Sequence, residues 1–199
     1  MQQFSKTHFK DKLKKITFTK FIQVDIMDGK FVKNRSLTSK SFKKIKIDKK
    51  VEYHLMIKNP ENKIDAFLAL KPYSIIFHYE ATKKINELIK KIKSKKVRVG
   101  IAINPETEVE KIFLYLKKID SVLVMTVHPG FYGSRFTKSS LKKIRKLRRM
   151  TKLPIEVDGH INDKTSKLVK QAGANILISG SYIFENNPKK TYYQLLKNQ

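Results

Sequence analysis

The chain of 199 residues contains no cysteine, which excludes disulfide bonds, thiolate metal sites and cysteine nucleophiles. No apolar run approaches the roughly 20 residues that a membrane-spanning helix needs. The segment from Met1 to Lys20 is polar and basic, and it lacks the apolar region of a secretory signal. We therefore expect a cytoplasmic protein with neither a signal peptide nor a membrane span.

Acidic residues are scarce: 17 Asp and Glu stand against 44 Lys and Arg, for a net charge of +27. Such an excess favours either a polyanionic partner such as RNA or a lysine-rich surface in contact with water. The lysines are scattered in pairs over predicted helices, and aromatic residues are not interleaved with them as in single-strand binders. We expect a solvated lysine surface, whose positive field would also favour a small phosphorylated substrate. Nucleic-acid binding stays open as the alternative.

Short apolar runs predict strands, and each run is followed by a turn signal and a segment with helical character. The predicted strands are residues 21–25, 51–56, 74–78, 97–103, 121–127, 154–158 and 176–179. The predicted helices are residues 6–15, 59–70, 82–93 with Thr82 as the cap, 138–150 and 163–172, and a last one from about residue 189. A further helix is predicted from Thr107, where Thr107 and Glu110 have capping-box spacing.

Strands and helices alternate regularly without hairpin signals, which indicates a parallel sheet covered by helices. The regular period favours a closed (β/α)8 barrel over an open doubly wound sheet. Only seven strands are plain, and an eighth would have to lie within residues 1–5. We therefore predict a single α/β domain over residues 1–199, a TIM barrel with an abbreviated or missing first strand.

Polar residues collect at the carboxyl ends of the predicted strands: Asp25, His54, His78, Asn104, His128, Asp158 and Ser181. A parallel barrel carries its active site at that end. Taken alone, Asp25 could be a turn-capping residue, but the arrangement recurs along the chain. Two carboxylates, Asp25 and Asp158, with the imidazole of His54 suit a divalent cation such as Zn, Fe or Mn. They also suit acid–base chemistry on two faces of one carbon.

Other residues near the strand ends are candidates for substrate contacts. The methionines are either gap-filling core residues or an apolar floor beneath a planar intermediate; they are Met27, Met56 and Met125. Late glycine-containing turns suggest a phosphate cradle at Gly159 and at Gly180 with Ser181. Residues 130–133 read as a loop that could close over a substrate.

Several segments match one family in its own order over about residues 21–187: VDIMDGKFVKN, YHLMIKNPE, IIFHYEAT, GIAINPET, VLVMTVHPGFYGSRF, IEVDGHIN and GANILISGSYIF. On these segments the chain resembles the ribulose-phosphate 3-epimerases. The resemblance implies a ribulose-phosphate-binding TIM barrel that acts in the pentose phosphate pathway. It also implies metal-dependent epimerisation of D-ribulose 5-phosphate to D-xylulose 5-phosphate at C3, through an enediolate.

Residue roles follow from the same resemblance. Asp25 and Asp158 match the two catalytic aspartates, and with His54 they also match ligands of a divalent cation, which is Fe, Mn, Zn or Mg. Gln23 occupies the position of a further ligand. The residues that match substrate or phosphate contacts are Ser5, Met27, His54, Met56, Met125, Gly130, Phe131, Tyr132, Gly133, Gly159, His160, Gly180 and Ser181.

The chain departs from the family's pattern at four places. Gln23 replaces a histidine, and its amide oxygen is a poorer ligand for Zn or Fe, which implies either weaker metal binding or a shift of preference towards Mn or Mg. The strand that carries a substrate-binding serine is shortened, so Ser5 is the remaining match. Tyr132 replaces a glycine of the closing loop, and His160 replaces the second glycine after Asp158.

Two alternatives stay open beside this function: an epimerase of a related ketose phosphate such as allulose 6-phosphate, and a degenerate basic barrel that binds RNA or another polyanion. Related decarboxylases and synthases carry an Asp-x-Lys-x-x-Asp pattern, whereas Asp25 to Asp28 has no lysine. Members of the family are usually oligomeric, so the resemblance implies a homo-oligomer, although like-charged subunits would repel at low salt.

Overall fold

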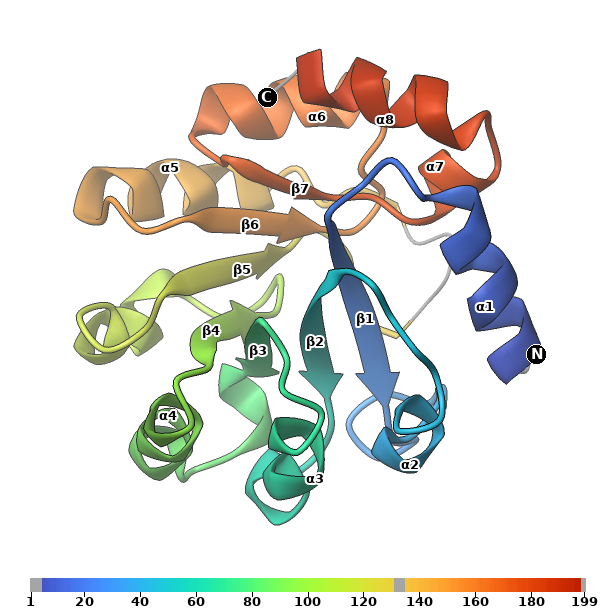
Figure 1. Ribbon diagram of the computed structural model, residues 1–199. Helices are drawn as coiled ribbons and strands as arrows, with labels where there is room; N and C mark the ends of the chain where they lie inside the picture. Colours follow the sequence, from blue (N-terminus) through green and yellow to red (C-terminus); the bar gives the residue numbers. More distant parts are fainter. Residues whose placement is uncertain (1–4, 131–134, 198–199) are drawn as a thin grey trace. The chain divides into compact units, whose positions relative to one another are not determined.

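The computed structural model describes residues 5–130 and 135–197, and the chain divides into two compact units, residues 1–100 and 101–199. In each unit parallel strands alternate with helices, and the strands follow one another in chain order (Figure 1). Strand β4, Arg98–Ile103, runs across the boundary between the units. Among the described residues no helix is long and apolar enough to cross a membrane.

The first unit contains three parallel strands and their connections. Its elements are α1 (Lys6–Lys15), β1 (Phe21–Met27), α2 (Ser39–Phe42), β2 (Lys50–Met56), the 3-10 turn η1 (Pro60–Asn62), α3 (Ile64–Leu68), β3 (Ser74–His78), the 3-10 turn η2 (Tyr79–Ala81) and α4 (Ile85–Ser94). Asp25 of β1 lies opposite His54 of β2, which lies opposite Ile76 of β3. This register brings residues 29 positions apart in the chain onto neighbouring strands at the same level.

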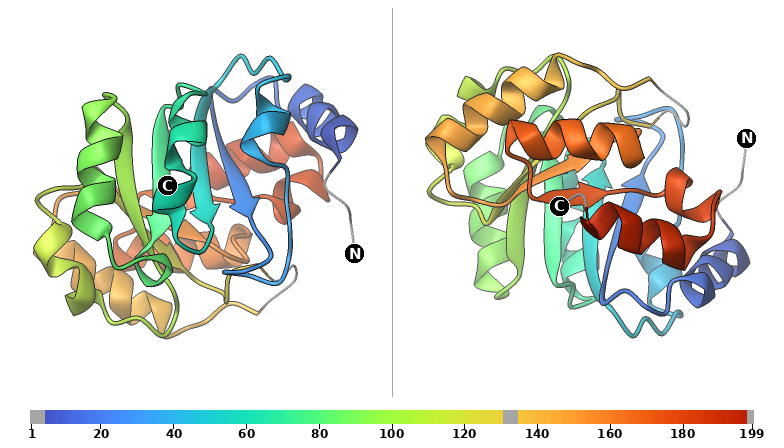
Figure 2. Two further views of the ribbon diagram at one scale, coloured as in Figure 1. Left: turned by 90° about the horizontal axis from the view of Figure 1, so that it is seen from below. Right: turned by 90° about the horizontal axis from the view of Figure 1, so that it is seen from above.

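The core of the first unit explains why these segments form strands and helices. All five residues of β3 are buried, as expected for a strand covered on both faces. Helix α4 buries Ile85, Leu88, Ile89 and Ile92, which are spaced along one helical face. Each such side chain stabilises the fold by about 1.5–3 kcal/mol through burial. Helices α2, α3 and α4 lie on one side of β1 to β3 (Figures 1 and 2).

The second unit repeats the pattern with the 3-10 segment η3 (Val109–Tyr115), β5 (Ser121–Met125), α5 (Ser140–Met150), β6 (Ile155–Asp158), α6 (Asp163–Ala172), β7 (Ile176–Ile178), α7 (Ser181–Phe184) and α8 (Pro188–Lys197). Strands β5, β6 and β7 are parallel, so Met125, Asp158 and Ile178 lie at one level. Helices α5, α6 and α8 lie on one side of these strands (Figure 2).

Several predicted elements are confirmed at their predicted bounds: α1, β3 and α6. The ends of α6 show why. Asn162 accepts the backbone N–H groups of Lys164 and Thr165, and the Thr165 hydroxyl accepts the N–H of Asn162. Gly173 ends the helix with a φ of 110°, a conformation that glycine adopts easily. Local sequence signals therefore determine this helix at both ends.

Three predicted helices differ from the structure in or near their first turns. The helix predicted from Asn59 is divided into η1 and α3, because Asn59 is left-handed and Lys63 leaves helical backbone angles. The Thr107 capping box does not form: η3 begins at Val109 without a side-chain cap. Thr82 accepts the backbone N–H of Lys84, and α4 begins only after that turn.

The prediction that the lysines lie on solvated surfaces fails for Lys143 of α5. This residue is 7% exposed, and its ammonium donates to the carbonyl oxygens of Asn104 and Thr107. A buried cation needs such acceptors, because an unpaired buried charge is costly. Lys143 therefore secures the loop that follows β4.

Candidate active site

Asp25 stands on the face of β1 that it shares with Gln23 and Met27, since alternate residues of a strand point the same way. Val24 and Ile26 point to the opposite face and are buried. The Asp25 side chain is 43% exposed, so a substrate can reach it. Gln23 Nε2 donates to Asp25 Oδ1 over 3.0 Å and fixes that oxygen.

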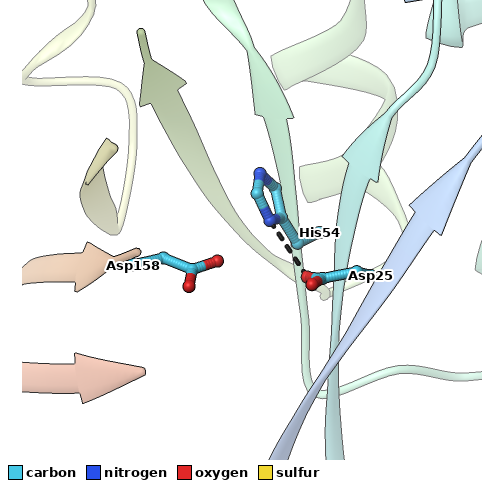
Figure 3. A group of neighbouring side chains, drawn as sticks. All are labelled: Asp25, His54 and Asp158. Atoms are coloured by element: carbon cyan, nitrogen blue, oxygen red, sulfur yellow. Dashed lines mark hydrogen bonds and ion pairs between the residues drawn. The ribbon is translucent and has the colours of Figure 1, made fainter. Parts of the chain in front are cut away.

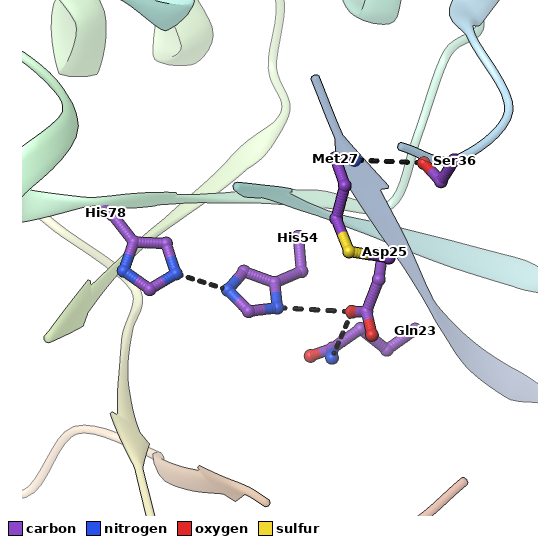
Figure 4. Close-up of polar contacts among 6 residues, drawn as sticks. All are labelled: Gln23, Asp25, Met27, Ser36, His54 and His78. Carbon is purple, nitrogen blue, oxygen red and sulfur yellow. Dashed lines mark hydrogen bonds and ion pairs between the residues drawn. The ribbon is translucent and has the colours of Figure 1, made fainter. Parts of the chain in front are cut away.

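His54 is fully buried and links Asp25 to a second histidine. Its Nδ1 lies 3.2 Å from Asp25 Oδ1 (Figure 3). Gln23 contacts the same oxygen (Figure 4). The Nε2 of His54 lies 2.8 Å from Nε2 of His78 at the end of β3 (Figure 4). The two rings meet edge to edge through this contact, with their centroids 5.0 Å apart, so each restricts the orientation of the other (Figure 4).

His78 continues the chain of contacts to Glu80 of η2. Its Nδ1 lies 3.4 Å from Glu80 Oε2, an ion-pair distance that does not meet hydrogen-bond geometry. The His78 side chain is fully buried, the Glu80 side chain is 22% exposed, and the ring of Phe31 packs 4.8 Å from His78. Sequence reasoning found His78 as a polar strand end but missed Glu80, for which the signal was a carboxylate two residues after a strand-end histidine.

The loop that follows β1 is anchored by Asp28. The Asp28 carboxylate accepts the backbone N–H groups of Lys30, Phe31 and Lys58, and Lys58 follows β2. Burial acts to raise the pKa of Asp28, but these N–H groups and the nearby Lys63 ammonium outweigh it and hold the pKa below its usual value. Asp28 is thus an ionised structural residue.

Two further contacts complete that anchor. Ser36 and Met27 are joined by two hydrogen bonds. The Ser36 hydroxyl accepts the Met27 N–H (Figure 4), and the Ser36 N–H donates to the Met27 carbonyl. Gly29 has a φ of +72°, and a Cβ there would meet Arg35 at 2.5 Å. The backbone beyond Asp25 is therefore fixed on both sides of the turn, and sequence reasoning did not identify Ser36.

In the second unit Asp158 ends β6 (Figure 3), and Thr126 anchors the turn behind it. The Thr126 N–H donates to the Asp158 carbonyl over 2.8 Å, and its hydroxyl contacts the carbonyls of Asp158 and Gly159. Gly159 has a φ of +120°, and a Cβ there would meet Val127 at 2.6 Å. His160 is also left-handed, with a φ of 51°, so it occupies a backbone conformation that glycine adopts more easily.

The remaining predicted residues lie in varied surroundings. Ser5 caps α1, and its hydroxyl accepts the His8 N–H. Met56 and Met125 are 3% exposed, whereas Gly180 and Ser181 are exposed at the start of α7. His128 is exposed and pairs with Glu106 over 3.1 Å. Phe131, Tyr132 and Gly133 lie outside the described residues, as does most of residues 1–5, the segment predicted to hold an eighth strand.

A divalent cation fits the pair formed by Asp25 and His54. A carboxylate oxygen and an imidazole nitrogen lie 3.2 Å apart on neighbouring strands, and both are ordinary ligands for Zn, Fe or Mn. The other nitrogen of His54 is held by His78, as is common for metal-binding histidines. These residues could therefore hold a metal.

Comparison with solved structures supports the fold class. The crystal structure of 3-hexulose-6-phosphate synthase from Salmonella typhimurium superposes with a TM-score of 0.79 at 17% identity, and covers 100% of this chain and 95% of its own. At this identity the likeness concerns the fold alone. The predicted α/β TIM-barrel class is confirmed.

Comparison with curated sequences identifies the family. A ribulose-phosphate 3-epimerase of Bacillus subtilis is 37% identical over 177 residues, which is 85% of this chain and 82% of the relative. The Helicobacter pylori (strain J99) protein of the same name is 33% identical over 198 residues, 96% of this chain and 91% of the relative. A sequence model of the ribulose-phosphate 3 epimerase family matches residues 3–184. The chain therefore belongs to the ribulose-phosphate 3-epimerase family.

Proposed function

We propose that this protein interconverts D-ribulose 5-phosphate and D-xylulose 5-phosphate by inverting the configuration at C3. The observation that carries the proposal is the family match over residues 3–184 together with the paired Asp25 and His54 near the carboxyl ends of β1 and β2. Relatives that bear the name of this activity span most of their own length in the match. The cytoplasmic location and the homo-oligomer stay predictions.

In this proposal Asp25 and Asp158 exchange protons with C3 from opposite faces. One carboxylate removes the C3 proton, and the other returns a proton to the other face, so the configuration inverts without any other bond being broken. Asp25 suits the role because its carboxylate is exposed, while Gln23 fixes one of its oxygens. Asp158 suits it because Thr126 and Gly159 hold the turn behind it.

Asp25, His54 and Asp158 are the proposed metal ligands, with Gln23 as a further candidate. A bound divalent cation would stabilise the negative charge that develops on the substrate oxygens as the proton leaves. His54 keeps its ligand nitrogen in place because its ring is buried and its other nitrogen contacts His78. The Gln23 amide orients the Asp25 carboxylate, so Asp25 Oδ1 stays close to Nδ1 of His54.

The substrate's contacts are proposed from the family resemblance. Met27, Met56 and Met125 would line an apolar floor, and Ser5 and His54 would contact the sugar. The phosphate would lie at Gly159, His160, Gly180 and Ser181, with residues 130–133 closing over it. The same residues could bind allulose 6-phosphate. Measuring the turnover of each ketose phosphate decides which of them is the substrate.

The two-aspartate proposal is tested by deuterium incorporation at C3 when D-ribulose 5-phosphate is incubated in D2O. We expect incorporation with the wild type and a loss of about 100-fold or more in turnover with Asp25→Asn or Asp158→Asn, in line with general acid–base contributions. The matched control is Asp65→Asn, an exposed aspartate that pairs with Lys91 at the surface. Activity retained by either active-site variant would contradict the assigned roles.

A second candidate function is polyanion binding, which one feature of the first unit favours. A hollow of about 760 Å³ there has ten lining residues, and six of them are charged: Lys14, Lys20, Lys46, Lys49, Lys50 and Asp48. The Lys49 ammonium donates to the Thr19 carbonyl over 2.6 Å, while Lys20 and Lys46 are exposed. A concave basic surface is an electrostatic site for phosphates.

This candidate is tested by the salt dependence of binding to random single-stranded RNA. The double variant Lys20→Glu/Lys46→Glu is compared with Lys83→Glu/Lys90→Glu, which changes the net charge equally through exposed residues of the same unit. If the hollow binds RNA, the slope of log K against log salt falls by about 1.4 in the first variant alone, at roughly 0.7 per phosphate contact. Equal effects of the two variants would mean a diffuse field and no site.

A further inference from the structure

Two exposed aromatic rings meet at the amino ends of the strands in the first unit. Phe21 begins β1 and Tyr73 immediately precedes β3, and their ring centroids lie 5.3 Å apart in an edge-to-face arrangement. The two residues are 51% and 37% exposed. Among residues 5–100, the described part of this unit, they are the only exposed large apolar side chains. Single exposed apolar residues are ordinary, but two that gather at one place mark a candidate interaction surface.

Two cations lie over these rings. The Lys50 ammonium lies 5.1 Å from the centroid of each ring, and the guanidinium carbon of Arg98 lies 5.6 Å from that of Tyr73. These are cation–π distances, at which a ring face attracts positive charge. Lys50 begins β2 and Arg98 begins β4, so the four residues are at least 23 positions apart in the chain. The fold therefore interleaves aromatic and basic side chains that the sequence keeps apart.

The ring pair borders the basic hollow of the same unit, since Lys50 is one of the charged residues that line the hollow. Thr19, another lining residue, holds Phe21 in place: its hydroxyl donates to the Phe21 carbonyl over 2.7 Å and accepts the Phe21 N–H over 3.3 Å. The Lys50 N–H donates to the Lys20 carbonyl over 2.9 Å, and the Lys49 ammonium donates to the Thr19 carbonyl. The hollow and the rings thus form one continuous surface on a fixed backbone.

The combination of lysines and aromatic rings selects the kind of partner. Lysine ammonium groups attract phosphates of any origin, whereas an exposed ring adds affinity for a ligand that has a flat face of its own. The bases of single-stranded nucleic acids offer such faces, but the bases of a duplex are already stacked on one another. The hollow has five lysines against one aspartate, so its charge complements a phosphate backbone.

We propose that this surface binds single-stranded nucleic acid, with phosphates at the lysines of the hollow and bases stacked against Phe21 and Tyr73. The proposal rests on the second candidate function, polyanion binding, and adds the class of polyanion and the residues that contact its bases. Phe21 lies four residues before Asp25 on β1, which is about 13 Å along the strand. The bound strand and the sugar phosphate would therefore lie at opposite ends of β1.

The first test compares two fluorescein-labelled strands that carry the same phosphates. One is an oligothymidylate of about 12 nucleotides, and the other is an abasic strand of the same length. Affinities are measured by fluorescence anisotropy at one salt concentration, because the phosphate contribution depends on salt. Stacking on one ring changes affinity by about 5- to 150-fold, so the wild type should bind the oligothymidylate at least about 5-fold more tightly. Equal affinity for the two strands would overturn the proposal.

The second test uses the variants Phe21→Leu and Tyr73→Leu, which keep an apolar side chain and the net charge but remove a ring. Each should weaken binding of the oligothymidylate by about 5- to 150-fold and leave binding of the abasic strand unchanged. The matched control is Tyr193→Leu, which removes a ring of a residue that is 47% exposed on α8 in the second unit. If both ring variants bind the oligothymidylate as tightly as this control does, the stacking role is refuted.

The lysine variant separates this proposal from the function on which it rests. If Lys20→Glu/Lys46→Glu weakens binding of both strands while the ring variants bind like the wild type, polyanion binding stands and the stacking surface is wrong. If the wild type binds neither strand, polyanion binding fails and the proposal falls with it. Circular dichroism of each variant verifies that it is folded.

Discussion

The substitution Gly159→Ala tests how the turn behind Asp158 is built. Gly159 has a φ of +120°, which L residues rarely adopt, and the new Cβ would lie 2.6 Å from Val127 Cγ2 and 2.9 Å from the Val127 backbone nitrogen. The backbone conformation costs about 1–3 kcal/mol. Overpacking against a neighbour that cannot move freely costs about 1–3 kcal/mol more. The expected loss of stability is therefore about 2–6 kcal/mol.

The assay is thermal unfolding followed by circular dichroism. For a chain of this size a loss of 1 kcal/mol lowers Tm by about 2–4 °C, so Gly159→Ala should lower Tm by at least about 4 °C. The matched control is Gly180→Ala, because a Cβ at Gly180 meets nothing within 4 Å and its φ is −102°. If both variants unfold within about 1 °C of the wild type, the rigidity assigned to the turn after Asp158 is refuted.

Three further predictions concern buried ionisable groups and the metal. Burial raises the pKa of Tyr53 to about 12, so between the unfolded value of about 10 and pH 12 the folded protein should lose about 1.4 kcal/mol of stability per pH unit. Urea midpoints at pH 9 and 11 should show this loss in the wild type and not in Tyr53→Phe. Because the pKa of Asp28 is lowered, the ionised side chain stabilises the fold above pH ~4, and this stabilisation is lost as the pH falls through the folded pKa. The variant Asp28→Asn should therefore unfold more easily than the wild type at pH 7, and its stability should fall less steeply as the pH is lowered. Gln23→His should bind Zn or Fe more tightly by about tenfold or more, and unchanged affinity in a chelator competition would mean that Gln23 does not face the metal.

Elements with complete local signals could be predicted from the sequence. Strand β3 is a short, wholly buried apolar run, and α6 has its cap at Asn162 and its stop at Gly173. Thr107 and Glu110 have the spacing of a capping box. The carbonyl oxygen of Thr107, however, accepts a hydrogen bond from Lys143, which comes 36 residues later. Such a contact overrides a local preference and leaves no mark within the segment itself.

The sequence predicts the candidate site only in part, because several of its contacts join residues that are distant in the chain. The sequence predicts Asp25 and His54 as polar strand ends, and the parallel register of β1 and β2 places them opposite each other. The link from His54 to His78 depends on how two neighbouring strands align, which no single stretch of sequence specifies. The Thr126 contacts with the turn after Asp158 likewise join residues more than 30 positions apart.

The most direct measurement is the turnover of D-ribulose 5-phosphate by the metal-stripped protein, and then after Fe, Mn, Zn or Mg is added in turn. We predict that the stripped protein is inactive, that at least one metal restores formation of D-xylulose 5-phosphate, and that Asp158→Asn stays inactive with the same metal. Folded protein that forms no D-xylulose 5-phosphate with any of these metals would contradict the proposed epimerase.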